Sequence, residues 1–340
     1  MECLDLQTKV MKVTINDHGG DGLYMDRLLF YLKSQLPLQV KSIKPIRNHV
    51  FLLETDSSKY VVKGYSSYRR LKTQMNITED LMKNGFTHTY SFLDLTNGSP
   101  LFFEQSFYGI IEYLQPSENV FTFAVPHNRV EGLTLLHEYH EISKMLVQKY
   151  ESKLKKQHLL HKWRGRTATF LNNISFIKFF LQKEIIEDIL RWTDWSLNGL
   201  EQEYSIKDSN VILHGDLAHH NFLRTKGEEL HLIDFDLISI GETSLDYLQY
   251  ANRILPYIHW SFDNLSELEK IQPFLDSKLF LYGLAFPTDI FREWNRVIRE
   301  KQYNNPVIMR QLLDLTAGQF YERQRFVKEL QDALEVLSKK

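Results

Sequence analysis

Apolar and polar residues alternate with a period of two between residues 39 and 65, as they do in half-buried strands. The alternation predicts three strands, at Val40–Ile43, Val50–Glu54 and Lys59–Lys63. A polar turn, Thr55–Ser58, joins the last two, so that they can pair directly. We therefore expect a short antiparallel sheet near the start of the chain.

Helices are expected on both sides of this sheet. Before it, the sequence predicts a strand at Val10–Ile15, a turn at Gly19–Gly22 and a helix at Tyr24–Gln35. The glycines of HGGDG are not followed by the Lys-Ser/Thr pair of a phosphate-binding loop, and we interpret them as a turn. After the sheet, a helix is expected at Arg69–Asn84, with Gly85 as its C-terminal cap.

A second strand-rich stretch follows this helix. The turn signal Thr96–Ser99 lies between Ser91–Asp94 and Pro100–Phe107, which predicts a hairpin. The second arm continues as an apolar strand, Tyr108–Pro116, which a proline ends.

Helical periodicity dominates the chain after about Ser117. Helices are expected at Val130–Lys153, Thr167–Leu190 and Trp192–Glu203, and again from Asn252 onward. Strands first and helices afterwards are typical of an α+β fold.

Residues 211–236, VILHGDLAHHNFLRTKGEELHLIDFD, interrupt the helices with short apolar runs and acidic residues. Val211–Leu213 and Leu230–Ile233 are expected as strands, with a hairpin-like turn around Lys226–Gly227. Such a pair would set the acidic groups that follow the two strands side by side.

The polar residues after these strands suit phosphoryl transfer from a nucleotide. Asp216 can accept a proton from an attacking hydroxyl or orient it, and the oxygens of Asn221 and Asp234 are ligands suited to Mg²⁺. Two other interpretations stay open. The residues can be ordinary turn and strand-end residues, or they can join His219 and His220 in a transition-metal site.

The composition, with 43% hydrophobic and 25% charged residues, is that of an ordinary globular protein. A net charge of -2 argues against a nucleic-acid-binding role. The single cysteine, Cys3, rules out an internal disulfide. Charges break every apolar stretch before it reaches bilayer length, and the start of the chain lacks a signal-peptide pattern. We therefore expect a soluble protein.

HGDLAHHN at 214–221, followed by IDFD at 233–236, resembles the catalytic segment of the aminoglycoside phosphotransferase and choline kinase-like group. The resemblance implies a two-lobed, protein kinase-like α+β fold that transfers the γ-phosphoryl group of ATP to a hydroxyl or amine of a small molecule. It makes Asp216 the catalytic residue, and it makes Asn221 and Asp234 the ligands of Mg²⁺.

The same resemblance assigns nucleotide contacts to the N-terminal sheet. Lys63, in VVKGY, would hold the phosphates, and the Glu112 carbonyl and Leu114 amide would contact adenine. Arg47 would add charge to the phosphate-covering loop Pro45–His49, which contains no glycine.

One expected partner of Lys63 is missing. In the resembled family the helix at 69–84 supplies a glutamate that pairs with this lysine, but Gln74 stands at that position. The nearest acid, Glu79, comes one to two turns too late. If Gln74 faces Lys63, a hydrogen bond replaces an ion pair and catalysis is weaker.

Three further residues are given structural roles. His214 is expected to pack in the core and to hydrogen-bond backbone near Asp234. By resemblance, His140 is structural within the helix LHEYHEIS, and Asp246 braces the catalytic loop. An acid in the first turn of a helix is an equally good interpretation of Asp246.

The resemblance divides the chain into a nucleotide-binding lobe at 1–114, with an N-terminal extension at about 1–38, and a catalytic and acceptor-binding lobe at 115–340. The acceptor has no sequence signature. Four side chains are unranked candidates for its pocket: Asp276, Arg292, Trp294 and Arg296.

Within this superfamily, HGDLAHHNFL and the glycine-free loop are most similar to the spore-coat-associated kinase-like proteins of endospore-forming bacteria. That likeness implies a second class of function, a coat scaffold with weak or no activity. It implies a cytoplasmic or spore-coat location, and a small-molecule acceptor or other coat proteins as partners, with no nucleic acid or membrane. A third alternative is a regulatory module that binds ATP without turnover.

Overall fold

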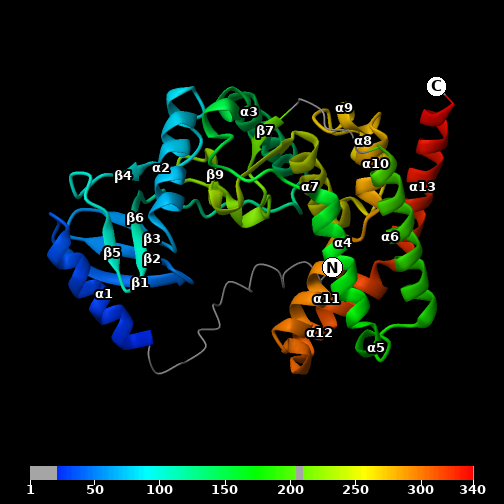
Figure 1. Cartoon of the computed structure of the whole chain (residues 1–340), viewed down its shortest axis with the longest axis horizontal. Helices are drawn as coiled ribbons and strands as arrows, with labels where there is room; N and C mark the ends of the chain where they lie inside the picture. The colour runs from blue at the N-terminus through cyan, green and yellow to red at the C-terminus, as the bar shows by residue number, and fades with distance from the viewer. Residues whose placement is uncertain (1–20, 204–209, 340) are drawn as a thin grey trace. The chain divides into compact units, whose positions relative to one another are not determined.

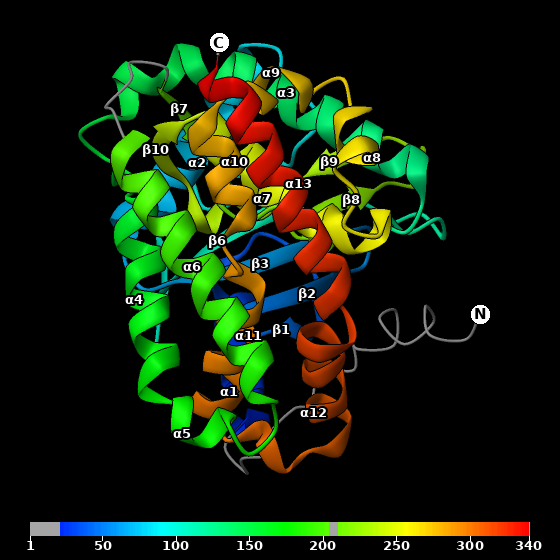
Figure 2. The same cartoon turned by 90° about the vertical axis from the view of Figure 1, so that its right-hand side faces the viewer.

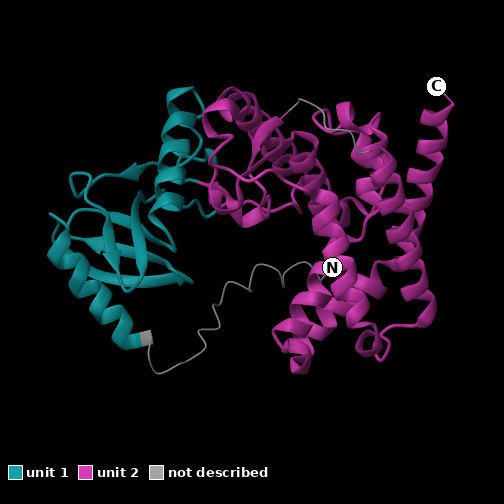
Figure 3. Cartoon of the chain, viewed as in Figure 1, with its two compact units in different colours: residues 1–118, 225–231 teal, residues 119–224, 232–340 magenta. Residues whose placement is uncertain are grey.

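The computed structural model describes residues 21–203 and 210–339 (Figure 1). The strand expected at Val10–Ile15 and the glycines Gly19 and Gly20 lie outside these residues. The chain divides into two compact units, residues 1–118 with 225–231, and residues 119–224 with 232–340 (Figure 3). The first unit therefore includes a short segment from much later in the sequence.

The first unit contains two helices and a sheet. Their bounds are α1 (Asp21–Gln35), β1 (Val40–Arg47), β2 (Val50–Thr55), β3 (Lys59–Tyr65), α2 (Tyr68–Lys83), β4 (Phe92–Leu93), β5 (Leu101–Phe103) and β6 (Ser106–Glu112). The sheet is antiparallel, with the order β1-β2-β3-β6-β4, and β5 also pairs with β6. The three strands expected from the alternating pattern are confirmed.

The expected loop Pro45–His49 is mostly strand. Pro45 pairs with Phe51 within β1 and β2, and only Asn48 and His49 form the turn between the strands. His49 has a φ of +57°, as a tight hairpin turn requires. Proline is tolerated in β1 because β1 is an edge strand of the sheet.

The hairpin expected around Thr96–Ser99 is wrong in its pairing. Asp94 Oδ1 closes that turn locally by accepting hydrogen bonds from the backbone N–H groups of Thr96 (3.2 Å) and Gly98 (2.9 Å). The strand before the turn, β4, pairs with β6 and not with β5. β5 and β6 form the hairpin instead, through the positive-φ residues Glu104 and Gln105.

Alternation in the sheet sends its residues to two faces. Val62 and Ile110 belong to one hydrophobic cluster with Leu28 and Leu32 of α1. The next residue on β3, Lys63, is paired with Gly109 of β6, and both therefore point to the opposite face.

Helix α2 contacts the face that carries Lys63. A Cβ added to Gly109 would lie 2.7 Å from Leu71 Cδ1, so the missing side chain lets α2 approach β6 closely. Ser67 caps the start of α2 by accepting from the Arg70 N–H, and Gly85, with a φ of +104°, follows its end. The helix predicted at 69–84 is thus confirmed.

The second unit is mainly helical. Its longer helices are α3 (Pro126–Tyr150), α4 (Leu159–Asn172), α6 (Lys183–Glu203), α7 (Ser244–Ile254), α10 (Lys278–Ala285), α11 (Thr288–Arg299), α12 (Pro306–Leu313) and α13 (Phe320–Ser338). Shorter ones are α5 (Ile174–Ile177), α8 (Phe262–Ser266) and α9 (Gln272–Leu275). Its strands are β7 (Asn210–Leu213), β8 (Phe222–Arg224) and β10 (Ser239–Glu242), and β9 (Leu230–Leu232) crosses the division.

Close packing of helices forms the core of the second unit. α10 contacts both α6 and α13 (Figure 2). Gly199 of α6 makes room for this contact, because a Cβ there would lie 2.3 Å from the ring of Tyr282. Ser196 of α6 donates a hydrogen bond to the backbone carbonyl of the same tyrosine.

Two expectations in this unit are wrong. The helix expected at Thr167–Leu190 is broken, because Asn173 Nδ2 turns back to the Thr169 carbonyl (2.9 Å) and α6 starts only at Lys183. Strand 211–213 does not pair with strand 230–233. β7 pairs with β10, and the turn around Lys226–Gly227 joins β8 and β9.

No helix in residues 21–203 and 210–339 is long and apolar enough to cross a membrane. The helical character expected after residue 252 is confirmed.

Candidate functional site

The segment that follows β7 can turn sharply only because it contains a glycine. Gly215 has a φ of +79°, and a Cβ there would lie 2.4 Å from the Leu237 carbonyl oxygen. Both the left-handed backbone and this contact exclude a side chain. The turn places Asp216 beyond the end of β7, with its side chain about one-third exposed.

A buried carboxylate holds this turn in place. Asp246, in the first turn of α7, accepts hydrogen bonds from the backbone N–H groups of His214 (2.7 Å) and Gly215 (3.0 Å) and from His140 Nε2 (3.0 Å). Burial opposes its ionisation, but the hydrogen bond and charge of His140 keep the pKa of Asp246 below its usual value. The bracing role expected of Asp246 and the structural role expected of His140 are therefore confirmed.

His214 joins the catalytic turn to the strand that carries Asp234. His214 Nε2 donates to the Ile233 carbonyl at 3.0 Å, as expected from the sequence. Its Nδ1 faces the Asp216 N–H at 3.4 Å, which fits the neutral ring. Burial lowers the pKa of His214 and keeps the ring in that neutral form.

Asn221 is held between the two predicted motifs. Its backbone carbonyl accepts from the Ile233 N–H (2.9 Å), and its side-chain Nδ2 donates to the Asp216 carbonyl (2.8 Å). The amide nitrogen is thereby used, and the side-chain oxygen is the atom that remains for a metal. The side chain is almost fully buried, so its position is fixed by packing as well.

Asp234 has an uncommon backbone conformation. Its φ of +71° and ψ of +68° lie in the left-handed region, which costs a residue with a side chain about 1–3 kcal/mol. Strain of this kind persists where the surroundings enforce it and is concentrated at functional sites. Ile233, the residue before it, is fixed by both His214 and Asn221.

The oxygens of Asn221 and Asp234 fit a Mg²⁺ ion, which binds few protein oxygens and keeps several waters. Among the described residues no three His, Cys, Asp or Glu side chains converge as a metal cluster. His219 and His220 lie in a 3₁₀ turn ending at Asn221, where burial lowers the pKa of His219. The sequence placed these residues in one loop, and the structure brings Asp216, Asn221 and Asp234 together through hydrogen bonds.

In the first unit, Lys63 is buried, with 5% of its surface exposed. Gln74 of α2 is also buried and accepts a hydrogen bond from Tyr65 Oη (2.9 Å). Tyr65 lies two residues after Lys63 on β3, so both project to the face that α2 contacts. Glu79 is exposed and pairs with Lys83. Gln74, and not Glu79, is therefore the α2 residue at the position where a glutamate partner of Lys63 was expected.

The other predicted nucleotide contacts lie at ends of strands in the same unit. Arg47 ends β1, is exposed and is paired with Val50 across the tight turn. Glu112 ends β6, where its side chain accepts from the Ser91 N–H at 2.5 Å. Leu114 follows two residues later, outside the strand.

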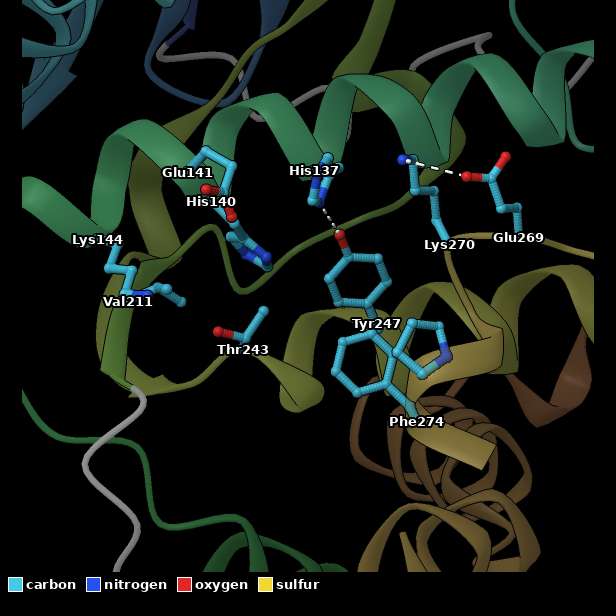
Figure 4. A pocket seen from close by; sticks show the side chains of 11 residues that line it. His137, His140, Glu141, Lys144, Val211, Thr243, Tyr247, Glu269, Lys270 and Phe274 are labelled. Carbon is cyan, nitrogen blue, oxygen red and sulfur yellow. Dashed lines mark hydrogen bonds and ion pairs between the residues drawn. The ribbon is translucent and has the colours of Figure 1, made fainter. Parts of the chain in front are cut away.

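The larger of two cavities in the second unit does not contain the catalytic turn. It has a volume of about 320 Å³ and is lined by His137, His140 and Tyr247, among others (Figure 4). The Tyr247 hydroxyl and His137 Nδ1 are 3.3 Å apart across it, and Lys270 pairs with Glu269 at its edge. Of Asp246 and the His140 that binds it, only His140 lines this cavity. The volume of a cavity therefore does not identify the candidate site.

The smaller cavity, about 80 Å³, adjoins the catalytic turn through Gly215 and Arg253. Arg253 Nη2 lies 3.4 Å from Asp216 Oδ1. Arg292, one of the four unranked candidates, lines this cavity, whereas Trp294 is fully buried and donates to Thr316. Sequence reasoning missed Arg253 and the cations of α4, because an arginine on a helix carries no local signal of what it faces.

The fold is shared with small-molecule kinases of known structure. An aminoglycoside phosphotransferase from Alicyclobacillus acidocaldarius matches with a TM-score of 0.70 at 16% identity, over 89% of this chain and 95% of that one. Spectinomycin phosphotransferase, in complex with ADP and spectinomycin, matches with a TM-score of 0.58 at 16% identity, over 91% and 97% of the two chains.

Amicoumacin kinase hAmiN, in complex with AMP-PNP, Ca²⁺ and Ami, matches with a TM-score of 0.54 at 16% identity, over 92% of this chain and 94% of that one. No protein-family model and no curated protein matches the sequence. The expected α+β, protein kinase-like fold, with a small antiparallel sheet and a larger helical part, is confirmed.

Proposed function

We propose that this chain is a phosphotransferase that moves the γ-phosphoryl group of ATP to a hydroxyl or amine of a small molecule. The observation that carries the proposal is the fixed set formed by Asp216, Asn221 and Asp234. Three hydrogen bonds join the segments that carry these residues: Asn221 Nδ2 donates to the Asp216 carbonyl, and the backbone of Ile233, next to Asp234, bonds to Asn221 and His214. The buried Asp246 accepts hydrogen bonds from the turn before Asp216. Because strained backbone conformations are concentrated at functional sites, the left-handed backbone of Asp234 favours a functional role over an ordinary turn.

Each residue of the set has a distinct task. Asp216 orients the acceptor hydroxyl and takes its proton as the oxygen attacks. Asn221 and Asp234 hold Mg²⁺, which neutralises charge on the phosphates when bound. His214 stays neutral and keeps Asp216 and Asp234 in register, and Asp246 and His140 keep the turn rigid.

Nucleotide binding is assigned to residues of the first unit. The buried ammonium of Lys63 holds the phosphates, and Arg47 adds charge at the tip of the β1–β2 turn. The backbone of Glu112 and Leu114 contacts the base. The nucleotides seen with structural neighbours, ADP and AMP-PNP, support ATP as the donor.

A second candidate is a kinase-like scaffold with weak or no activity, as in the spore coat proteins that the sequence resembles. Gln74 favours it, since an uncharged amide bonded to Tyr65 stands where an ion-pair partner of Lys63 is expected. A regulatory module that binds ATP without turnover is the third candidate.

Thermal unfolding with and without Mg²⁺-ATP separates these candidates. ATP at about 100 times its dissociation constant should add about 2.7 kcal/mol of stability. We expect this gain in the native chain and in Asp216→Asn, and its loss in Asp234→Ala. Asp332→Ala, an exposed residue of α13, is the matched control and should behave as the native chain.

Turnover then decides the rest. With a library of hydroxyl and amine acceptors, the native chain should release ADP faster than Asp216→Asn does. A stability gain without turnover by any acceptor favours the regulatory module. No gain at millimolar nucleotide rejects the phosphotransferase and leaves the scaffold.

A further inference from the structure

The small cavity beside the catalytic turn is lined by an excess of positive charge. Four of its residues are cations: Lys162 and Arg166 of α4, Arg253 of α7 and Arg292 of α11. Only two are carboxylates, Asp246 and Asp289. The cations come from three different helices and meet only through the tertiary fold.

Both carboxylates of the cavity already have hydrogen-bond or ion-pair partners other than the four cations. Asp246 accepts the three hydrogen bonds of the brace. Asp289 forms a bidentate ion pair with Arg323, with distances of 3.1 and 2.6 Å. The two carboxylates therefore offset only part of the charge of the four cations, and their hydrogen bonds go to other partners.

The cations themselves are poorly paired. Arg166 donates to a neutral hydroxyl, that of Thr288. Arg253 makes one long contact with Asp216, at 3.4 Å. Arg292 uses only its Nε, on Glu293 at 2.9 Å.

Lys162 also lines the cavity, and no carboxylate within the described ranges is in ion-pair distance of its Nζ. In Arg166, Arg253 and Arg292, several guanidinium N–H groups therefore remain for a ligand.

Three of the cations have lowered pKa values, because they are buried and lie near other positive charges. Burial and the charge of Arg292 lower the pKa of Arg166. The same two causes lower the pKa of Arg253 to about 10. The pKa of Lys162 falls through removal from water and through Arg166. Like charges gathered at one cavity destabilise the fold until an anion joins them.

We propose that the phosphoryl acceptor is a small hydroxylated molecule with an anionic group, a phosphate or a carboxylate, which binds the Lys162–Arg166–Arg253–Arg292 cluster. The proposal rests on the phosphotransferase function proposed above. With its anionic group on the cluster, the acceptor can present a hydroxyl to Asp216, which Arg253 already contacts. A polycationic acceptor such as an aminoglycoside would meet four like charges.

Phosphoryl transfer to such an acceptor forms one P–O bond and breaks another. The acceptor oxygen forms a bond to the γ-phosphorus of ATP, the bond from that phosphorus to the β-phosphate oxygen breaks, and ADP leaves with the electron pair. The hydroxyl proton passes to the Asp216 carboxylate. The product is a phosphoester that still carries the original anionic group.

Calorimetric titration of the nucleotide-free full chain tests the cluster with paired probes. Glycerol 3-phosphate and glycerate carry the two anionic groups, glycerol is their neutral partner, and kanamycin is the cationic probe. We expect one of the anions to bind and glycerol and kanamycin to show no binding at the same millimolar concentration. The anion that binds more tightly shows whether the cluster prefers a phosphate or a carboxylate.

Charge-removing variants locate the binding. Arg166→Gln and Arg292→Gln should each weaken the anion by about tenfold or more, since a charge-assisted hydrogen bond is worth roughly 1.5–3 kcal/mol. Arg166→Lys should recover part of the loss. Arg164→Gln is the matched control, because Arg164 lies on the same helix but is exposed and pairs with Glu201. It should bind as the native chain does.

The inference is overturned if neither anion binds, if kanamycin binds in their place, or if Arg166→Gln and Arg292→Gln bind the anion as Arg164→Gln does. Thermal unfolding with Mg²⁺-ATP, run in parallel, keeps the two proposals apart. A nucleotide gain without anion binding rejects the anionic acceptor alone. Anion binding without a nucleotide gain rejects the phosphotransferase and with it the acceptor role, and leaves the cluster as an anion-binding site.

Discussion

Asp246→Asn removes one charge from the brace of the catalytic turn while keeping the size of the side chain. The carboxylate accepts three hydrogen bonds, one at Oδ1 from Gly215 (3.0 Å) and two at Oδ2, from His214 (2.7 Å) and His140 (3.0 Å). An asparagine has one acceptor oxygen. Its best placement keeps the two bonds of Oδ2 and turns its amino group toward the Gly215 N–H.

The cost follows from this placement. One buried N–H loses its partner, which costs about 1–3 kcal/mol, and the two remaining bonds lose charge assistance, about 1 kcal/mol each. Relief from burying a charge offsets part of the loss. We expect unfolding free energy to fall by about 3 kcal/mol, a drop in Tm of roughly 6–12 °C for a cooperative unit of about 200 residues.

Urea unfolding of the native chain, Asp246→Asn and Asp332→Asn measures this cost. Asp332 undergoes the same chemical change in an exposed pair with Lys328 (2.9 Å), which water screens and which adds little stability. The pKa of Asp246 is lowered in the fold, so its contribution is complete above its ordinary value of 3.8 and is lost as the pH falls through the lower, folded value. The gap between native and Asp246→Asn should therefore narrow below about pH 4. Equal stabilities of the two variants at pH 7 would refute the bracing role.

Three further outcomes are expected. Gly215→Ala should cost at least about 2 kcal/mol in urea unfolding and lower turnover, because the backbone is left-handed and a Cβ would lie 2.4 Å from the Leu237 carbonyl; a native-like variant contradicts this. Burial lowers the pKa of His214, so the folded chain should lose stability as the pH falls below 6.5. The loss from this one group is up to about 1.4 kcal/mol per pH unit. An unfolding free energy that stays constant between pH 7 and 5.5 contradicts this prediction. Gln74→Glu should raise the affinity for Mg²⁺-ATP, because it places an acid on the face that carries Lys63. The thermal shift measures this affinity. A lower stability with unchanged affinity would show that Gln74 serves only the packing of α2.

Local chemistry was readable in the sequence. The period-two alternation at 39–65 identified three neighbouring strands, since consecutive strands joined by short turns pair with each other. The spacing of Asp216, Asn221 and Asp234 placed three oxygen-bearing side chains around a short loop. The hydrogen bond of His214 to backbone near Asp234 was expected from the sequence, and the bracing role of Asp246 was one of the two interpretations that the sequence left open.

Pairing between distant segments was not readable. β4 pairs with β6 and not with β5, to which we expected a hairpin turn to join it. β7 pairs with β10 and not with the strand at 230–233. The apolar pattern of a short strand states which face is buried, and it does not state which strand lies beside it. Long-range packing makes that choice.

The sequence by itself determined which polar residues form the candidate site, because Asp216, Asn221 and Asp234 are close in the chain and their spacing is fixed by one loop. The charge of the acceptor cavity was decided only by the tertiary structure. Lys162, Arg166, Arg253 and Arg292 lie on three helices, far apart in the sequence. The interaction energy of two charges falls with the distance between them. The role of each cation therefore depends on which other helices the fold brings close to it.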